Sequence, residues 1–308
     1  MVTPKDIADA ARALHEGKLV VMPTETVYGL GANALSDEAV AGIYAAKQRP
    51  EFNPLIVHVA DIDAAEKLGA FKGVAKRLAR AFWPGALTLV VPKTPKCQAS
   101  RLATAGLKTI ALRVPAHPIA KMLLNAADLP IAAPSANVSG KLSPTRIEHL
   151  QGLDDKNISA VLDAGATEVG VESTIVACNG DKATLLRPGG ISRADIEKVL
   201  RAPLGTQKKS NKPNAPGQLE SHYAPKASIR LNVSETAPNE GLLAFGAAVL
   251  AHAGPVRNLS PSGDMQEAAA NLFSFLHELD AEADRIAVMT IPDEGLGEAI
   301  NDRLRRAA

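Results

Sequence analysis

The sequence predicts a mixed α/β (α+β) fold with one large domain and one small domain. Residues 1–205 contain short apolar runs of strand length and amphipathic stretches of helix length, but these two kinds of segment do not alternate strictly. This irregular order favours a mixed sheet with helices over a regular doubly wound sheet. Beyond the polar segment 206–225, strands and helices do alternate, which is typical of a small parallel sheet in residues 226–308. A chain of 308 residues is long enough for two such cores.

The large domain begins with a helix that has clear start signals. Thr3 is a capping residue, and Pro4 and Asp6 occupy the first turn. Gly17 ends this helix, and a buried strand follows at 18–22. The further elements expected in this domain are a segment 28–32 that leads into a helix at 36–47, strands at 55–60, 87–91, 108–114, 130–133, 160–163, 173–177 and 183–186, and helices at 73–82, 118–125 and 192–200.

The composition of 206–225 predicts a linker, because the segment is polar, contains proline and glycine, and is poor in apolar residues. Beyond it we expect strands at 228–233, 241–245 and 285–289, and helices at 265–279 and 296–306. The run Phe245-Gly246-Ala247 does not match the GxGxxG pattern of a dinucleotide site. We therefore assign no dinucleotide binding to the small domain.

Composition favours a soluble, reduced, cytoplasmic protein. No apolar run approaches the roughly 20 residues that a membrane helix needs. The N-terminal residues lack the cationic-then-apolar order of a secretory signal. Cys97 and Cys178 are the only cysteines, and the seven histidines have no metal-binding spacing. A disulfide framework or a zinc knuckle is therefore not expected.

The net charge of +1 conceals an uneven distribution. Residues 1–205 contain 24 lysines and arginines against 20 acidic residues, whereas residues 226–308 contain 7 against 12. The stretch 67–127 carries eleven basic residues and no acidic one. Most such runs are solvated helix faces, but a basic half beside an acidic half indicates that the large domain handles phosphate or nucleic acid.

No motif indicates a nucleophile, a metal centre or a Walker-type phosphate loop. Instead, basic, amide and hydroxyl side chains gather at the ends of the expected elements: Thr26, Lys47, Arg49, Arg113, Ser135, Asn137, Ser143, Ser173 and Arg187. The sequence nominates no base beside a serine. This inventory suits a reaction that needs only orientation and charge neutralisation, and phosphoryl or nucleotidyl transfer is the leading case.

Several of the candidate residues also have a purely structural interpretation. Lys47 and Arg49 lie near a helix C-terminus, where cations are favourable without any ligand, although two prolines make the same loop rigid. His58 alternates within a strand as an ordinary core histidine does, and Glu25 could simply cap a neighbouring helix. Arg113 is different, because an arginine inside an apolar strand is seldom buried without an anionic partner.

Several segments together resemble one family. In chain order, PTETVYGLG, KQRPEFNPLIVHV, FWPGALTLVV, IALRVP, APSANVSG, VESTIV and LLRPGGIS are similar to the threonylcarbamoyl-AMP synthases of the YrdC-like fold. The segment PGQLESHYAP at 216–225, followed by a small second domain, resembles the long, two-domain form. The resemblance implies a YrdC-like mixed twisted sheet with helices around a basic cavity, and a small Rossmann-like α/β domain after it.

The resemblance also implies an enzyme, an L-threonylcarbamoyladenylate synthase of the nucleotidyltransferase class. Such an enzyme joins L-threonine, bicarbonate and ATP into L-threonylcarbamoyl-AMP and pyrophosphate, the first step of threonylcarbamoyladenosine modification of ANN-decoding tRNAs. Mg²⁺ would accompany ATP without a dedicated protein site. A downstream tRNA threonylcarbamoyl transferase complex would receive the product. We further expect a monomer with at most weak contact to RNA and none to a membrane.

The same resemblance implies roles for individual positions. Lys47 and Arg49 would be catalytic and stabilise charge at the phosphates, and Arg113 would clamp the threonine carboxylate with a fork that lysine cannot copy. The linker would fold over the cavity as a lid. The implied threonine-binding residues are Thr26, His58, Arg113 and Ser173, and the implied ATP-binding residues are Arg49, Asn53, Thr109, Ser135, Asn137, Ser143, Arg187, His222 and Tyr223.

Two departures from the family pattern are modest. Gln48 stands between Lys47 and Arg49 where a small residue would be unsurprising, and Glu220 places an acid near the expected lid. The small domain is also short for the long form, and we expect it to be a folded support for the lid.

Two alternatives to the synthase stay open at this point. A module that binds double-stranded RNA or tRNA would explain the basic stretch 67–127. However, aromatic residues make up only 3% of the chain, which is too few for a stacking platform. The other alternative is a relative that transfers carbamoyl groups to a different acceptor.

Overall fold

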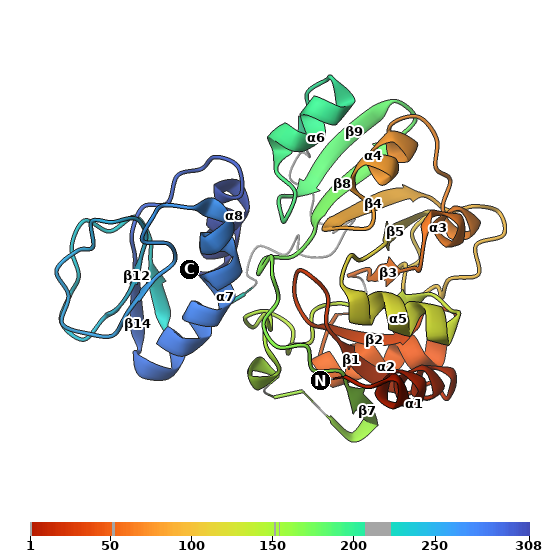
Figure 1. The fold of residues 1–308 in the computed structure, drawn as a ribbon, viewed down its shortest axis with the longest axis horizontal. Helices are drawn as coiled ribbons and strands as arrows, with labels where there is room; N and C mark the ends of the chain where they lie inside the picture. Colours follow the sequence, from red (N-terminus) through yellow and green to blue (C-terminus); the bar gives the residue numbers. More distant parts are fainter. Residues whose placement is uncertain (1, 51–52, 151, 154, 207–222) are drawn as a thin grey trace.

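The computed structural model describes residues 2–50, 53–150, 152–153, 155–206 and 223–308, and within them the chain forms two sheets flanked by helices (Figure 1). The larger sheet contains β1 (Leu19–Met22), β2 (Gly29–Asn33), β3 (Ile56–His58), β4 (Leu87–Pro92), β5 (Thr109–Arg113), β6 (Ile131–Ala132), β7 (Ile158–Val161), β8 (Thr174–Asn179), β9 (Lys182–Arg187) and β10 (Gly205–Thr206). The helices of the same domain are α1 (Pro4–His15), α2 (Asp37–Lys47), α3 (Ile62–Leu68), α4 (Val74–Phe82), α5 (Pro118–Ala127) and α6 (Arg193–Leu200), with 3-10 turns η1 (Ile147–His149) and η2 (Asp155–Asn157).

The strand order of the larger sheet is β10-β9-β8-β4-β5-β3-β6-β2-β1-β7. β3 pairs with β5, β4 with β8 and β1 with β7 in parallel, whereas β1–β2, β4–β5 and β8–β9 are antiparallel. The predicted mixed sheet is therefore confirmed. One face packs against α2, α3, α4 and α6 in the main core, and α1 and α5 cover the other face near β1.

Local signals explain where the first helices begin and end. The side chain of Thr3 accepts a hydrogen bond from the amide of Asp6 and completes a capping box at α1. The side chain of Ser36 caps α2 by accepting a hydrogen bond from the amide of Ala39, and Gln48 ends α2 in the left-handed conformation with φ of 50°. Glycine is favoured at such a position. The departure at Gln48 therefore lies at a helix end.

The segment 28–32 leads into α2 as a strand, β2, which pairs with both β1 and β6. Gly31 permits this close packing, because a Cβ there would stand 2.8 Å from the side chain of Ile131. Helix α3 was not expected from the sequence, although Asp61 caps it. Within the described part of the chain, no helix combines the length and apolar character needed to cross a membrane.

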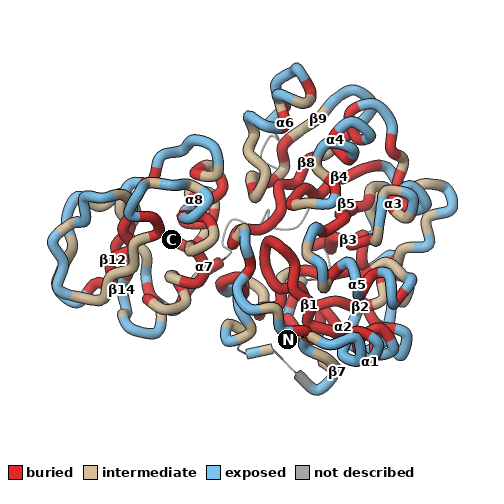
Figure 2. Tube along the Cα trace, viewed as in Figure 1, coloured by how far each residue is buried: buried red, intermediate tan, exposed pale blue. Residues whose placement is uncertain are grey.

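The small domain forms the expected parallel sheet. Its strands β11 (Ser228–Arg230), β12 (Gly241–Ala244), β13 (Val256–Asn258) and β14 (Arg285–Val288) lie in the order β11-β14-β12-β13. Helices α7 (Met265–Glu282) and α8 (Gly297–Ala307) lie between this sheet and the large domain (Figure 1). One buried cluster joins Val27 and Val171 of the large domain to Leu272 and Phe273 of α7. Figure 2 shows buried segments along α7 and in the adjacent part of the large domain. The two domains thus share a core where they meet.

Candidate active site

The polar side chains of the site project from one face of the larger sheet. Because side chains alternate along a strand, Val57 and Leu112 enter the core beneath the helices, and His58 and Arg113 point to the opposite face. β3 and β5 pair in a register that sets His58 beside Arg113. The sheet therefore brings two residues from distant motifs together.

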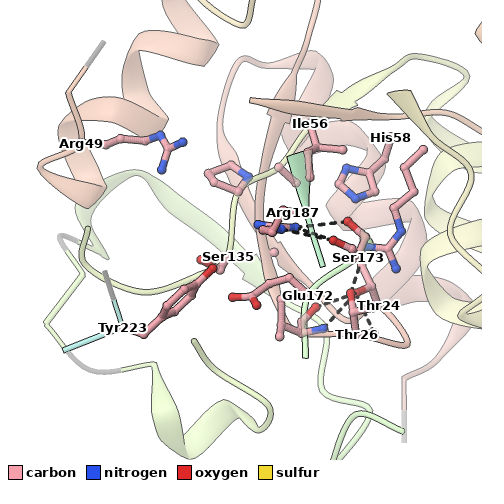
Figure 3. Close-up of a pocket in the computed structure, with 15 residues that line it drawn as sticks. Thr24, Thr26, Arg49, Ile56, His58, Ser135, Glu172, Ser173, Arg187 and Tyr223 are labelled. Atoms are coloured by element: carbon pink, nitrogen blue, oxygen red, sulfur yellow. Dashed lines mark hydrogen bonds between the residues drawn. The ribbon is translucent and has the colours of Figure 1, made fainter. Parts of the chain in front are cut away.

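A cavity of about 550 Å³ opens on this face (Figure 3). Its walls come from the β1–β2 loop, the ends of β3, β5 and β9, the loop after β6, and the residues before β8. Thr24 and Glu172 line it as well, although neither was singled out within the segments PTETVYGLG and VESTIV that contain them. The positions singled out from the sequence that line the cavity are Thr26, Arg49, His58, Arg113, Ser135, Ser173, Arg187 and Tyr223.

Three protein groups hold Arg113 in a fixed orientation. Its Nη1 donates to Oγ1 of Thr26 (2.9 Å) and its Nε to the carbonyl of Gly85 (3.2 Å). Its Nη2 forms an ion pair with Glu25 at 2.7 Å, too poorly aligned for a hydrogen bond. Burial raises the pKa of Glu25, but Arg113 outweighs burial and lowers it. The guanidinium thus still has donors to offer a ligand carboxylate.

His58 is a neutral side chain at neutral pH. Burial, followed by the charge of Arg113, lowers its pKa to about 3. Its Nδ1 finds no hydrogen-bond partner among the described residues. A buried polar atom without a partner is costly, and a polar ligand in the cavity would remove that cost. The environment of His58 therefore favours a binding role over that of an ordinary core histidine.

Ser173 and Arg187 form a second polar cluster (Figure 3). Arg187 donates through Nε and Nη2 to the carbonyl of Ser173 (3.2 and 2.9 Å) and through Nη2 to its hydroxyl (3.3 Å). The same hydroxyl lies 2.7 Å from Oγ1 of Thr88. Both residues are buried, so each fixes the position of the other at the cavity wall.

Lys47 supports one wall of the cavity from behind. It is the last residue of α2 and only 1% exposed. Its Nζ donates to the carbonyl of Ser135 (2.6 Å) and to that of Asn137. Burial, followed by repulsion from Arg49, lowers the pKa of Lys47 well below its usual value. The structure thus places this amine against the 135–137 backbone and not in the cavity lining.

Arg49 reaches the cavity from the loop after α2. Its Nε and Nη2 donate to the carbonyls of Asn53 (3.4 Å) and Pro54 (3.2 Å). Burial lowers its pKa to about 10, so it stays cationic at neutral pH. Asn53 is buried, and its amide group has no hydrogen-bond partner in the described part of the chain. Thr109 lies apart from these residues, at the start of β5 opposite Pro92.

The remaining positions expected to contact ATP do not all line this cavity. Asn137 lines a neighbouring cavity of about 1290 Å³ and donates to two carbonyls of its own loop (both 2.8 Å). Ser143 is buried and donates to Oε1 of Glu172 (2.5 Å). Tyr223 lines the first cavity, and His222 lies outside the described residues.

The ion pairs of the two acidic residues at the site were not predicted from the sequence, where Glu25 was interpreted only as a helix cap. Glu25 pairs with Arg113, and Glu172 pairs with Arg303 of α8, each at 2.7 Å. Each acid immediately precedes a candidate binding residue: Glu25 precedes Thr26, and Glu172 precedes Ser173. The position of each acid next to a predicted ligand contact was therefore the signal in the sequence that could have indicated a role at the site.

The described residues contain no group of three or more His, Cys, Asp or Glu side chains that could hold a metal ion. The acidic side chains of the site, Glu25 and Glu172, are both engaged by arginines. They therefore do not fit a dedicated Mg²⁺ cage, whereas an ion bound mainly by substrate phosphates and water fits this donor set.

Two family models together match nearly the whole chain. One, for the Sua5, YciO and YrdC proteins and described as "Telomere recombination", matches residues 12–189. The other, described as the C-terminal domain of threonylcarbamoyl-AMP synthase, matches residues 191–308. The threonylcarbamoyl-AMP synthase of Bacillus subtilis is 43% identical over 98% of this chain and 92% of its own length. That of Pyrococcus abyssi is 40% identical over 97% and 93%.

Solved structures agree with this assignment. The crystal structure of P. abyssi Sua5 complexed with L-threonine matches with a TM-score of 0.90 and 38% identity, over 100% of this chain and 95% of that one. Escherichia coli YciO, at 23% identity and a TM-score of 0.55, shares the fold over 61% of this chain and 91% of its own. The chain therefore belongs to the threonylcarbamoyl-AMP synthase family, in its two-domain Sua5 form.

Proposed function

We propose that the chain makes L-threonylcarbamoyl-AMP from L-threonine, bicarbonate and ATP and releases pyrophosphate. One observation carries the proposal: a single cavity combines a carboxylate-binding fork, Arg113, with two further arginines, Arg49 and Arg187. The threonine carboxylate, the carbamate and the triphosphate are three anionic groups that must share one site, so cations have to line it. Membership in the synthase family supports the same reaction.

The reaction needs no protein nucleophile. The amino group of threonine takes up CO₂ derived from bicarbonate and loses a proton, which gives a carbamate. A carbamate oxygen attacks the α-phosphorus of ATP, the bond to the oxygen bridging α and β breaks, and pyrophosphate leaves. The protein has to align these groups, stabilise the spreading charge and keep water from the mixed anhydride.

Threonine would occupy the end of the cavity where β3 and β5 pair. Arg113 would bind its carboxylate while Glu25 and Thr26 keep the guanidinium plane fixed. The neutral ring of His58 would use Nδ1, and Ser173 would contact the amino acid from the side of β8. The complex of P. abyssi Sua5 with L-threonine supports a threonine site in this fold.

ATP would lie toward Arg49, Arg187 and Ser135, and Mg²⁺ held mainly by ATP and water would neutralise part of the phosphate charge. The two arginines would stabilise charge at the reacting phosphate, and Lys47 would act by fixing the loop that carries Ser135. The other ATP contacts that the family resemblance implies stay part of this proposal: Asn53, Thr109, Asn137, Ser143, His222 and Tyr223.

In the cell, the unstable product would pass to a tRNA threonylcarbamoyl transferase complex. We expect a monomer that works in the cytoplasm. Exposed basic residues of 67–127, such as Arg77 and Arg80 on α4, would allow weak contact with RNA.

The decisive experiment is pyrophosphate release from ATP and bicarbonate, with and without L-threonine, in the wild type and in Arg49→Ala. We expect release that depends on threonine and is lost in the variant, because Arg49 faces the phosphates. Release without threonine would indicate a carbamoyl-transfer relative with another acceptor. No release, together with steeply salt-dependent RNA binding, would favour the RNA-binding module.

A further inference from the structure

Helix α8 of the small domain reaches the wall of the cavity through one side chain. Arg303 is fully buried, and its Nε donates to Oε2 of Glu172 at 2.7 Å. Its Nη2 donates to the carbonyl of Pro188 at 3.0 Å, and its Nη1 to its neighbour Asp302 at 2.7 Å. An arginine near the end of the chain therefore bonds two residues that flank the catalytic cavity.

Glu172 is an anion in a cavity that three arginines also line. Its Oε1 accepts a hydrogen bond from Ser143, and its Oε2 accepts one from Arg303. Burial raises the pKa of Glu172, but Arg303 and then Arg187 outweigh burial and lower it to about 2. Among the described residues, the other charged side chains that line the cavity are three arginines. A carboxylate here opposes phosphate binding unless its charge is neutralised.

Tyr223 connects the small domain to the cavity in a second way. Its ring lies beneath the guanidinium of Arg303, 5.3 Å from the ring centroid. Its ring centroid also lies 5.5 Å from that of Phe273 in α7. Tyr223 is 1% exposed and lines the cavity (Figure 3). Both helices of the small domain thus hold this lining residue in place.

We propose that Arg303 is a positioning residue of the active site, which neutralises Glu172 and supports Tyr223 so that the cavity attracts the triphosphate of ATP. This inference rests on the proposed function, since it assumes that the phosphates approach Arg187 and Glu172. It gives the small domain a direct part in ATP binding. Without Arg303, the buried carboxylate would lose its counter-ion and repel the phosphates.

The first test is the affinity of full-length Arg303→Met for ATP, measured by calorimetry and as KM in pyrophosphate release. We expect ATP to bind roughly 10-fold more weakly, while the KM for L-threonine changes by less than about threefold, because only the phosphate side carries the new repulsion. Arg305→Met is the matched control, since that side chain on the same helix is 56% exposed. It should leave both values unchanged.

A second variant separates charge from packing. Glu172→Gln alone should tighten ATP binding, because Arg303 then contributes a cation without its carboxylate partner. Combined with Arg303→Met, it should bring the affinity for ATP back to within about threefold of the wild type, because the repulsive charge is gone. Arg303→Lys should fall between Arg303→Met and the wild type, since lysine keeps the charge but not the fork.

Other outcomes would overturn the proposal. If Arg303→Met raises the KM of ATP and of threonine equally and Glu172→Gln restores neither, the contact is only a tie between domains. If Arg303→Met does not fold, Glu172→Gln decides, and weaker ATP binding in that variant overturns the proposal. A wild type that binds ATP but releases no pyrophosphate with threonine would contradict the proposed function, and the ATP-binding comparison would still test Arg303.

Discussion

Two buried arginine–glutamate pairs serve the same cavity, but they present opposite charges to it. Arg113 lines the cavity and its partner Glu25 stands behind it, whereas Glu172 lines the cavity and its partner Arg303 stands behind. Both contacts measure 2.7 Å, and all of these side chains are nearly inaccessible to solvent. The first pair thus creates a binding group for an anion, and the second suppresses the charge of an anion.

The comparison shows that a buried ion pair can either favour or oppose the binding of an anion. In both pairs, loss of one partner leaves a buried charge, which typically costs roughly 3–5 kcal/mol. The functional result depends on which charge then faces the ligand. Without Glu25, an arginine with one support fewer would face threonine. Without Arg303, a carboxylate that has lost its ion-pair partner would face the phosphates. The pairs therefore invite matched variants that compare threonine binding with ATP binding.

Arg113→Met should have the largest effect. The variant removes the carboxylate fork and leaves the charge of Glu25 to repel threonine, so we expect kcat/KM for L-threonine to fall by roughly 10³-fold. Binding of ATP alone, measured by calorimetry, should change little, because Arg49 and Arg187 are untouched. Arg101→Met, at an exposed position of the same basic stretch, is the control. An equal loss of ATP and threonine affinity would contradict the division of the cavity into two sides.

Glu172→Gln should have an intermediate effect, visible as acid stability. The pKa of Glu172 is about 2 in the folded chain against an ordinary value of 4.5. Its ionised form therefore contributes stability that is present above about pH 4.5 and is lost as the pH falls toward 2. Between pH 4.5 and pH 3 the wild type should lose roughly 2 kcal/mol more unfolding free energy than Glu172→Gln.

Urea denaturation monitored through the single tryptophan, Trp83, is the appropriate measurement. Trp83 is buried in the core of the large domain, and its Nε1 donates to the carbonyl of Leu87. It therefore reports the domain that contains Glu172. If the unfolding free energies of the wild type and Glu172→Gln fall in parallel with decreasing pH, the ion pair with Arg303 does not stabilise the ionised form of Glu172.

The sequence predicted the pair at Arg113 in part and missed the pair at Arg303 entirely. Arg113 interrupts the apolar run IALRVP, so an anionic partner could be inferred from local pattern alone. Glu172 and Arg303 are separated by 131 positions and belong to different domains. No periodicity or spacing connects such residues, because only the packing of α8 against the large domain brings them together.

In the fold, too, features set by neighbouring residues were predicted, and features set by distant contacts were not. The mixed sheet and the caps Thr3 and Ser36 followed from local signals, since capping and strand length depend on neighbouring residues. The strand at 28–32 did not, because its conformation depends on pairing with β1 and β6 on either side. Similarly, Lys47 was predicted at the site by type and position. Its contact with the 135–137 backbone depends on a loop far away in the chain.

The smallest expected effect concerns a histidine pair near the second ion pair. The rings of His149 and His277 stack with centroids 4.0 Å apart, and Nε2 of His277 lies 3.2 Å from the carbonyl of Ser143. Burial, followed by His277 and Arg146, lowers the pKa of His149 to about 3. The neutral ring therefore contributes stability that is full above its ordinary pKa of 6.5 and declines as the pH falls toward 3.

His149→Gln should accordingly weaken the dependence of stability on pH between 6.5 and 5.5, by roughly 0.5 kcal/mol, because partial exposure of the ring reduces the effect. Urea denaturation at both pH values measures it, with the exposed His252→Gln as control. The result sharpens the contrast between the surroundings of the two ion pairs. On the side of Arg113, the ring of His58 is buried within one domain. At His149, protonation places a charge where two domains meet. The stability lost at low pH should therefore be accompanied by a weaker contact with α7. An unchanged slope in His149→Gln would mean that the stacked rings move apart without cost to the fold.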